Sequence, residues 1–98
     1  MIATLLLTLV LSITSTDDYG NTLSIRLYED GKAVMFAGDF LQARTRVDRE
    51  LQWEYDHDGN IIVWRGSRRV EHLVPFAGRW YGAISGNAYA NCLNAHSL

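Results

Sequence analysis

The chain has 98 residues, of which 48% are hydrophobic and 20% charged, and its formal net charge is −2 at pH 7. This length suits one domain with a single modest core, which we place over residues 1–98. The ordinary apolar fraction argues against disorder. The near-neutral charge excludes a global attraction to nucleic acid or to an anionic membrane. Cys92 is the only cysteine, which excludes an intramolecular disulfide and a cysteine metal cluster.

An apolar run from Ile2 to Thr16 opens the chain. Aliphatic residues recur at every second position and alternate mainly with Thr and Ser, which is the period of a half-buried strand. A secretory signal peptide is the competing interpretation, but no Lys or Arg precedes the run and no small-x-small cleavage site follows it. The run is also too short and too Thr-rich for a membrane helix. We therefore predict a strand in a cytoplasmic protein without membrane association, or a secreted protein if the run is a signal peptide.

Turn residues divide the next part of the chain. Asp17–Asn21 predicts a loop that would place Ile13 opposite Ile25. Asp30-Gly31 predicts a two-residue type I′ turn, because that turn needs positive φ at both central positions. In this register three strands share one apolar face, which consists of Leu9, Leu11, Ile13, Leu23, Ile25, Leu27, Val34 and Phe36.

The segment from Leu51 to Trp64 carries a second type I′ signal at Asp58-Gly59. That turn would place Tyr55 opposite Ile62, with the large apolar residues of both strands on one face. A slip of one residue would mix the two faces, so the turn and the hydrophobic pattern support each other. The sequence therefore predicts a central β-hairpin.

The remaining elements are less sharply marked. Gly38-Asp39 predicts a bulge or a corner. The alternation over Ala43–Val47 favours a strand over a helix at Phe40–Arg46 that Asp39 would cap. A further strand is predicted over Val70–Phe76.

Two interpretations stay open for the C-terminal part. Gly86-Asn87 can close a two-residue hairpin, or Asn87 can cap a short helix from Ala88 to His96. Short strands with turns every eight to twelve residues indicate an all-β fold. We expect a small antiparallel meander of about eight strands that forms a barrel or a sandwich, with the short helix as a C-terminal variant.

Signals for catalysis and for metal binding are weak. Asp56–Asn60 resembles the start of a calcium loop, but no later carboxylate follows, so a solvated hairpin tip is favoured. The three histidines, His57, His72 and His96, have no metal-ligand spacing. No phosphate-binding glycine loop, nucleophile elbow or triad is recognisable. We predict a non-catalytic protein with no catalytic residues, cofactor or metal.

Arginines gather in two sequence clusters close to aromatic residues. Aromatic side chains stack on bases and Arg contacts phosphates in single-strand binders. Acidic neighbours such as Asp48 and Glu71 dilute the positive field, and cross-strand ion pairs explain the arginines equally simply. Nucleic-acid binding is therefore an alternative and not the favoured function; it would involve Arg44, Arg46, Arg49, Arg65, Arg68 and Arg69.

The polar face of the first predicted sheet has the intermediate character of a surface that meets a partner. The candidate partner-binding residues on it are Thr8, Val10, Ser12, Arg26, Tyr28 and Met35. We predict a protein-binding β module that acts as an inhibitor, an adaptor or a self-assembling subunit. A homo-oligomer is expected, because the apolar residues before Leu9 have no partner in the first hairpin. A small-ligand-binding β-barrel is the further alternative.

Overall fold

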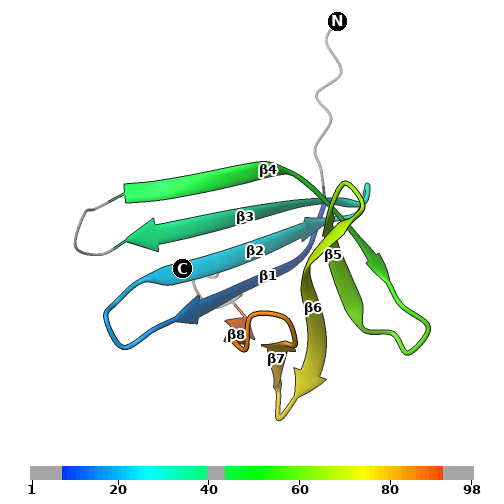
Figure 1. Cartoon of the computed structure of the whole chain (residues 1–98). Helices are drawn as coiled ribbons and strands as arrows, with labels where there is room; N and C mark the ends of the chain where they lie inside the picture. Colours follow the sequence, from blue (N-terminus) through cyan, green and yellow to red (C-terminus); the bar gives the residue numbers. More distant parts are fainter. Residues whose placement is uncertain (1–7, 40–43, 92–98) are drawn as a thin grey trace, which may run out of the picture.

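The computed structural model describes residues 8–39 and 44–91, and every regular element in these ranges is a strand. The strands are β1 (Leu9–Thr16), β2 (Thr22–Tyr28), β3 (Lys32–Asp39), β4 (Arg44–Tyr55), β5 (Ile61–Arg65), β6 (Arg68–Phe76), β7 (Arg79–Gly82) and β8 (Ala88–Asn91). Sequence neighbours pair antiparallel, and β8 pairs with β1, so the sheet closes into a barrel (Figure 1). The predicted all-β meander is confirmed in its barrel form. No helix in these two ranges is long and apolar enough to cross a membrane.

Inward-facing side chains of successive strands form the core. Side chains alternate between the two faces of a strand, so every second residue points into the barrel. The loop Asp17–Asn21 sets the predicted register, in which Ile13 pairs with Ile25. Burying an aliphatic side chain of this size contributes about 1.5–3 kcal/mol. The buried core cluster consists of Ile13, Ile25, Leu27, Ala33, Leu51, Ile61, Val63, Leu73 and Tyr89.

The turn between β4 and β5 lies at the predicted position but is not of type I′. Gly59 has a φ of 80°, whereas Asp58 is not among the residues with positive φ. The Gly59 amide donates to the Asp56 carbonyl at 3.2 Å, which makes a type I turn followed by a glycine in the G1-bulge position. The longer loop moves the register by one residue, so that Tyr55 pairs with Ile61 and not with the next residue.

The β2–β3 register is shifted by one residue in the same way, because Gly31 has a φ of 88° at the corresponding loop position. Ala33 is therefore buried in the core, and Met35 packs against it. Val34 and Phe36, which were predicted to face the core, take the outer face instead, although Val34 is still buried there. The shifted register is tolerated, because Ala33 and Met35 are apolar enough to fill the inward positions.

Replacing Gly59 with valine is expected to lower the free energy of unfolding by about 1–3 kcal/mol, because a β-branched side chain resists positive φ. No atom lies within 4 Å of the added Cβ, so the effect would come from the backbone and not from a clash. Urea denaturation measures it. Gly59→Asn is the matched control and should cost less, since Asn tolerates this region of φ. An unchanged denaturation midpoint for Gly59→Val would contradict the turn geometry.

The loops Asp17–Asn21 and Asp56–Asn60 share the sequence Asp-x-x-Gly-Asn and the same hydrogen bonds. In each loop the Asp Oδ1 accepts from the amide two residues later at 2.8 Å and from the Asn amide at 2.9 Å. Desolvation raises the pKa of both Asp carboxyls, but these hydrogen bonds outweigh it and hold the pKa below its ordinary value. At Asp56 the His72 ring contributes a further hydrogen bond.

Folding stability is expected to fall as the pH drops below about 4. A carboxyl whose pKa is lower in the folded chain stabilises the fold above its unfolded pKa and loses that contribution as the pH falls through the folded value. The double variant Asp17→Asn with Asp56→Asn should therefore show a flatter decline in acid, measured by urea denaturation at each pH. Asp18→Asn, at an exposed position of the same loop, is the control. An equally steep decline in the double variant would contradict the assignment.

Two-residue type I′ geometry occurs instead between β6 and β7. Ala77 has a φ of 52° and Gly78 a φ of 78°, and Phe76 pairs with Arg79 across them. Positive φ at a residue other than glycine is uncommon. An Ala-Gly dipeptide lacks the Asn or Asp that usually marks this turn, and the sequence did not predict it.

A β-bulge interrupts the pairing of β3 with β4. The register shifts by one between Ala33 and Met35, and Met35 pairs with Asp48. An extra residue of β4 is accommodated there, so both Asp48 and Leu51 lie on the inner side of the barrel. The bulge predicted at Gly38-Asp39 is wrong, because β3 continues through both residues.

β8 closes the barrel onto β1, where Ile13 pairs with Asn91 and Thr14 with Ala90. The chain itself thus supplies a partner for β1 at these positions. The helix alternative is wrong over Ala88–Asn91, and the rest of that segment lies outside the described residues. The self-association expected from the apolar residues before Leu9 rests on Ile2–Leu7, which also lie outside them.

The connection between β7 and β8 is longer than the two-residue turn predicted at Gly86-Asn87. β7 ends at Gly82, whose amide donates to the Asn87 carbonyl at 2.8 Å. The Gly86 amide donates back to the Gly82 carbonyl at 2.7 Å. These two bonds close a compact loop over residues 83–87.

Candidate binding groove

β4 is the longest strand in the described ranges, with 12 residues, and only part of it pairs with a neighbouring strand along both of its edges. It pairs with β3 from Arg44 to Gln52, but with β5 only from Gln52 to Tyr55. In Figure 1, β1–β4 lie side by side. The chain leaves this layer at the C-terminal end of β4, and β5–β8 lie below it. Within the described ranges, no strand pairs with the second edge of β4 over residues 44–51. A stretch of backbone N–H and C=O groups is therefore open to a partner.

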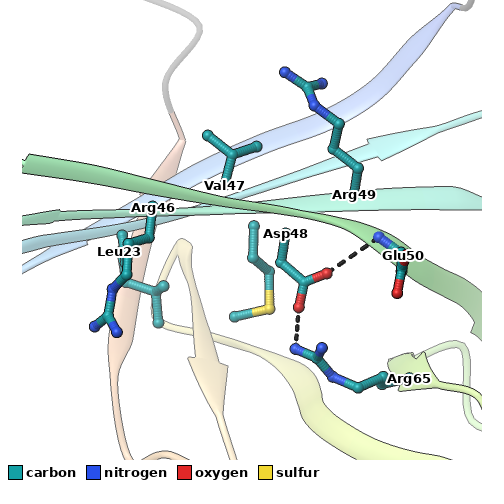
Figure 2. Close-up of a pocket in the computed structure, with 9 residues that line it drawn as sticks. Leu23, Arg46, Val47, Asp48, Arg49, Glu50 and Arg65 are labelled. Atoms are coloured by element: carbon teal, nitrogen blue, oxygen red, sulfur yellow. Dashed lines mark hydrogen bonds and ion pairs between the residues drawn. The ribbon is translucent and has the colours of Figure 1, made fainter.

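An open groove of about 670 Å³ lies beneath this edge, between β4 and the end of β5 (Figure 2). Its floor is apolar and comes from inward positions of β2 and β3: Leu23, Met35 and Ala37. Leu23 and Met35 also pack against the core. The volume falls in the range of small-ligand pockets, about 300–1,000 Å³.

Charged side chains form the wall of the groove. Arg46 and Asp48 point to the groove side of β4, while Val47 and Arg49 point to the opposite side (Figure 2). The bulge in β4 produces this arrangement, because it turns residues 46 and 48 inward beyond it. Sequence clusters alone do not reveal this division of the charges between two faces.

The charges of the groove wall are only partly neutralised. The Asp48 carboxylate accepts hydrogen bonds from the Arg65 guanidinium and, at 3.1 Å, from the Glu50 amide. Among the residues that the structure describes, no carboxylate lies at ion-pair distance from Arg46. The groove therefore offers one pre-formed ion pair, Asp48 with Arg65, and one cation, Arg46, that forms no ion pair within the described residues.

The arginines of the nucleic-acid alternative have different surroundings wherever the structure describes their side-chain contacts. Arg46 and Arg65 line the groove, and Asp48 neutralises Arg65. Arg69 lies with its guanidinium carbon 5.3 Å from the centre of the Trp64 ring. The other three are distributed along β4 and at the start of β6: Arg44, Arg49 and Arg68.

The predicted partner-binding residues lie mainly away from the groove. Met35 lines it, and its place on the polar outer face was predicted wrongly because of the register shift. Ser12 pairs with Arg26 and is buried, while the Arg26 guanidinium carbon lies 4.7 Å from the centre of the Phe36 ring. Of the remaining members, Thr8 precedes β1, Val10 is exposed near the start of β1, and Tyr28 ends β2.

A buried carboxylate links β6 to the β7–β8 loop and was not predicted as a site. Glu71, which was expected to dilute the surface field, is only 1% exposed. Its Oε2 accepts from the Ser85 hydroxyl at 2.6 Å and from the Tyr89 hydroxyl at 2.8 Å. Its Oε1 accepts from the amides of His72 and Ile84, both at 3.2 Å, and of Ser85 at 3.3 Å.

We expect the hydrogen bonds of Glu71 to stabilise the fold by holding the β7–β8 loop and β8 against β6. Burial, and then the neighbouring Glu71 carboxylate, raise the pKa of Tyr89 to about 12, against hydrogen bonds from Ser85 and Asn87. Tyr89 is therefore a neutral donor at physiological pH. The hydrogen bonds of the cluster fasten the loop before β8 onto β6.

A second polar pair joins the β4–β5 turn to β6 on the outer face. The His72 Nε2 and the Asp56 Oδ2 lie 2.8 Å apart. Within residues 8–39 and 44–91, no three His, Cys, Asp or Glu side chains are placed to hold a metal ion. The pair supports the turn and has no further ligand beside it in that part of the chain.

The floor, the wall and the open edge together make the groove beneath β4 the best-formed candidate binding site. Comparisons with protein families, with curated proteins and with solved structures gave no match for this chain.

Proposed function

We propose that this protein is a non-catalytic protein-binding module that receives an extended segment along the open edge of β4. The open backbone of residues 44–51 beside the groove is the observation that carries this proposal. An added strand gains main-chain hydrogen bonds, and pockets for its alternate side chains provide specificity. The module would act as an inhibitor, an adaptor or a self-assembling subunit.

The groove defines what such a segment should contain. The apolar floor of Leu23, Met35 and Ala37 would receive one aliphatic or aromatic side chain. Arg46 would pair with a carboxylate on the same face of the segment, because charge-assisted hydrogen bonds to carboxylates are among the stronger polar contacts. An extended segment with an apolar residue two positions from an acidic one is therefore the preferred ligand, because alternate side chains share one face of a strand.

Selection from a library of random displayed peptides, with the whole chain as bait, tests this proposal. The selected peptides should be enriched in an apolar residue two positions from an acidic one, and should shift the NMR amide signals of residues 44–51. Ala37→Arg, which fills the groove, should abolish binding, whereas Arg79→Ala on β7 should leave it unchanged. Selected peptides that shift other signals, or a selection that yields no binder, would overturn the proposal.

A small-ligand-binding barrel is the second candidate, supported by the size of the groove and its apolar floor. An environment-sensitive apolar dye is a suitable probe, and Ala37→Arg should remove its binding. Nucleic acid is the third candidate. Salt separates it from the first, because phosphate binding weakens steeply with ionic strength whereas a mostly apolar contact does not.

A further inference from the structure

We infer that the partner at the open edge of β4 is β4 of a second copy of this chain, paired antiparallel. This inference rests on the proposed function, and it names the occupant of the open edge; the groove-face side chains of that occupant, Arg46 and Asp48, are charged, so it satisfies the edge and Arg46 but leaves the apolar floor uncovered. The order of charges along the strand favours this partner. Positions 44 and 46 carry Arg, whereas positions 48, 49 and 50 carry Asp, Arg and Glu, so the open edge is basic in its first half and net acidic in its second half.

An antiparallel copy brings opposite charges together when the two-fold axis passes through Val47. Arg46 of each copy then lies opposite Asp48 of the other, on the groove face. Opposite charges in directly facing cross-strand positions stabilise a sheet, and like charges destabilise it. Arg46, which has no carboxylate at ion-pair distance among the described residues of its own chain, would gain one.

The register is specific, because neighbouring registers bring like charges together. A shift by two positions places either Asp48 opposite Asp48 or Arg46 opposite Arg46. A shift by one position towards the acidic half places Arg46 opposite Arg49. The sequence of β4 therefore selects the pairing centred on Val47 over these alternatives.

The opposite face of β4 supports the same pairing. Val47 is 43% exposed, although it lies in the middle of a strand. In the proposed register Val47 of one copy lies directly opposite Val47 of the other, and the two side chains cover each other. β-branched side chains in facing positions pack well across a strand pair.

The proposed pairing also closes on itself. An isologous strand pair uses the same edge of both copies, so the assembly stops at two chains. The two β1–β4 sheets become one continuous sheet, and the open edges of β4 disappear. An edge strand that would otherwise invite unlimited association is thereby satisfied.

A charge-exchange experiment tests the inference. The wild-type chain should sediment as a dimer at micromolar concentration. Arg46→Asp and Asp48→Arg each place like charges opposite each other in the homodimer, and each should weaken it about tenfold or more. An equal mixture of the two variants restores opposite charges at both pairs and should form a heterodimer of nearly wild-type affinity.

Two controls make the experiment decisive. Arg79→Asp changes the charge of an exposed residue on β7 and should leave the dimer intact. Because Asp48→Arg also removes the ion pair with Arg65, near-ultraviolet circular dichroism must show a native fold. The Arg46→Asp variant leaves that pair in place and serves as the independent second variant.

The outcomes separate this inference from the proposed function. A wild-type monomer at millimolar concentration, a dimer that survives both single substitutions, or folded variants that do not associate on mixing would each overturn the β4–β4 pairing. If displayed peptides still bind at residues 44–51 in that case, the edge serves another protein and the proposed function stands. If the peptides fail as well, both proposals fail.

Discussion

Replacing Glu71 with leucine is expected to lower the free energy of unfolding by about 3–5 kcal/mol. The hydroxyls of Ser85 and Tyr89 and three backbone amides donate to this carboxylate. Each buried donor left without an acceptor costs about 1–3 kcal/mol before the structure relaxes. The loss therefore exceeds that of an ordinary surface substitution several-fold.

Urea denaturation of Glu71→Leu measures this loss, with Glu29→Leu at an exposed turn position as the matched control. Tyr89→Phe removes one donor and leaves the acceptor, so it should cost only about 1 kcal/mol. A loss below about 1 kcal/mol for Glu71→Leu would show that the loop before β8 does not depend on the carboxylate.

The substitution Gly82→Ala is expected to cost about 3 kcal/mol, at the upper end for an overpacked site. A Cβ on Gly82 would lie 2.5 Å from Oε2 and 2.6 Å from Cδ of Glu71. The carboxylate cannot easily move, because its hydrogen bonds and its burial hold it in place. Glycine is therefore required here by the close approach of a side chain and not by backbone conformation.

Gly38→Ala is the matched control for this prediction. Its added Cβ would lie 2.7 Å from the Thr22 hydroxyl oxygen, which can rotate away because it ends a side chain. The penalty at Gly38 should therefore be smaller than at Gly82.

A double-mutant cycle between Gly82→Ala and Glu71→Ala separates the clash from other effects. Once the carboxylate is gone, the added methyl group should cost little, with a coupling of about 1–3 kcal/mol between the two sites. Additive losses would place the origin of the Gly82 effect elsewhere.

The hairpins show how far sequence patterns could predict this fold. Treating Asp17–Asn21 as a five-residue loop predicts the pairing of β1 with β2, and this register is confirmed. Asp56–Asn60 has the same Asp-x-x-Gly-Asn sequence, but a two-residue turn at Asp58-Gly59 predicts a register that is wrong by one residue. The decisive interaction is the carboxylate of the first Asp, which caps the amides of the longer loop. A turn prediction based on the Asp-Gly pair alone does not take this carboxylate into account.

The candidate site depended on features that the sequence carries weakly. Arg46 and Arg65 belong to the predicted arginine clusters. The neighbouring sequence, however, contains no recognisable signal for the bulge that turns Arg46 towards the groove. Met35 was predicted on the wrong face, because a register error of one residue exchanges the faces of a strand. The sequence did contain a signal for Glu71, because it lies two positions from the core residue Leu73 and therefore on the same face of the strand. Charged residues are so seldom fully buried that this position alone does not predict a buried glutamate.

The closure of the barrel by β8 has a consequence for folding. All strand pairs in the described ranges except β1–β8 join sequence neighbours, so most native contacts are local and low contact order favours rapid hairpin formation. The pairs Ile13–Asn91 and Thr14–Ala90 must instead enclose nearly the whole described chain, at the largest loop-closure entropy in the molecule. Within the part of the chain that the structure describes, these two pairs are the ones that hold β8 to β1. The barrel should therefore open first along this seam, and hydrogen exchange of the β8 amides should reveal a partly unzipped state well below the global unfolding free energy.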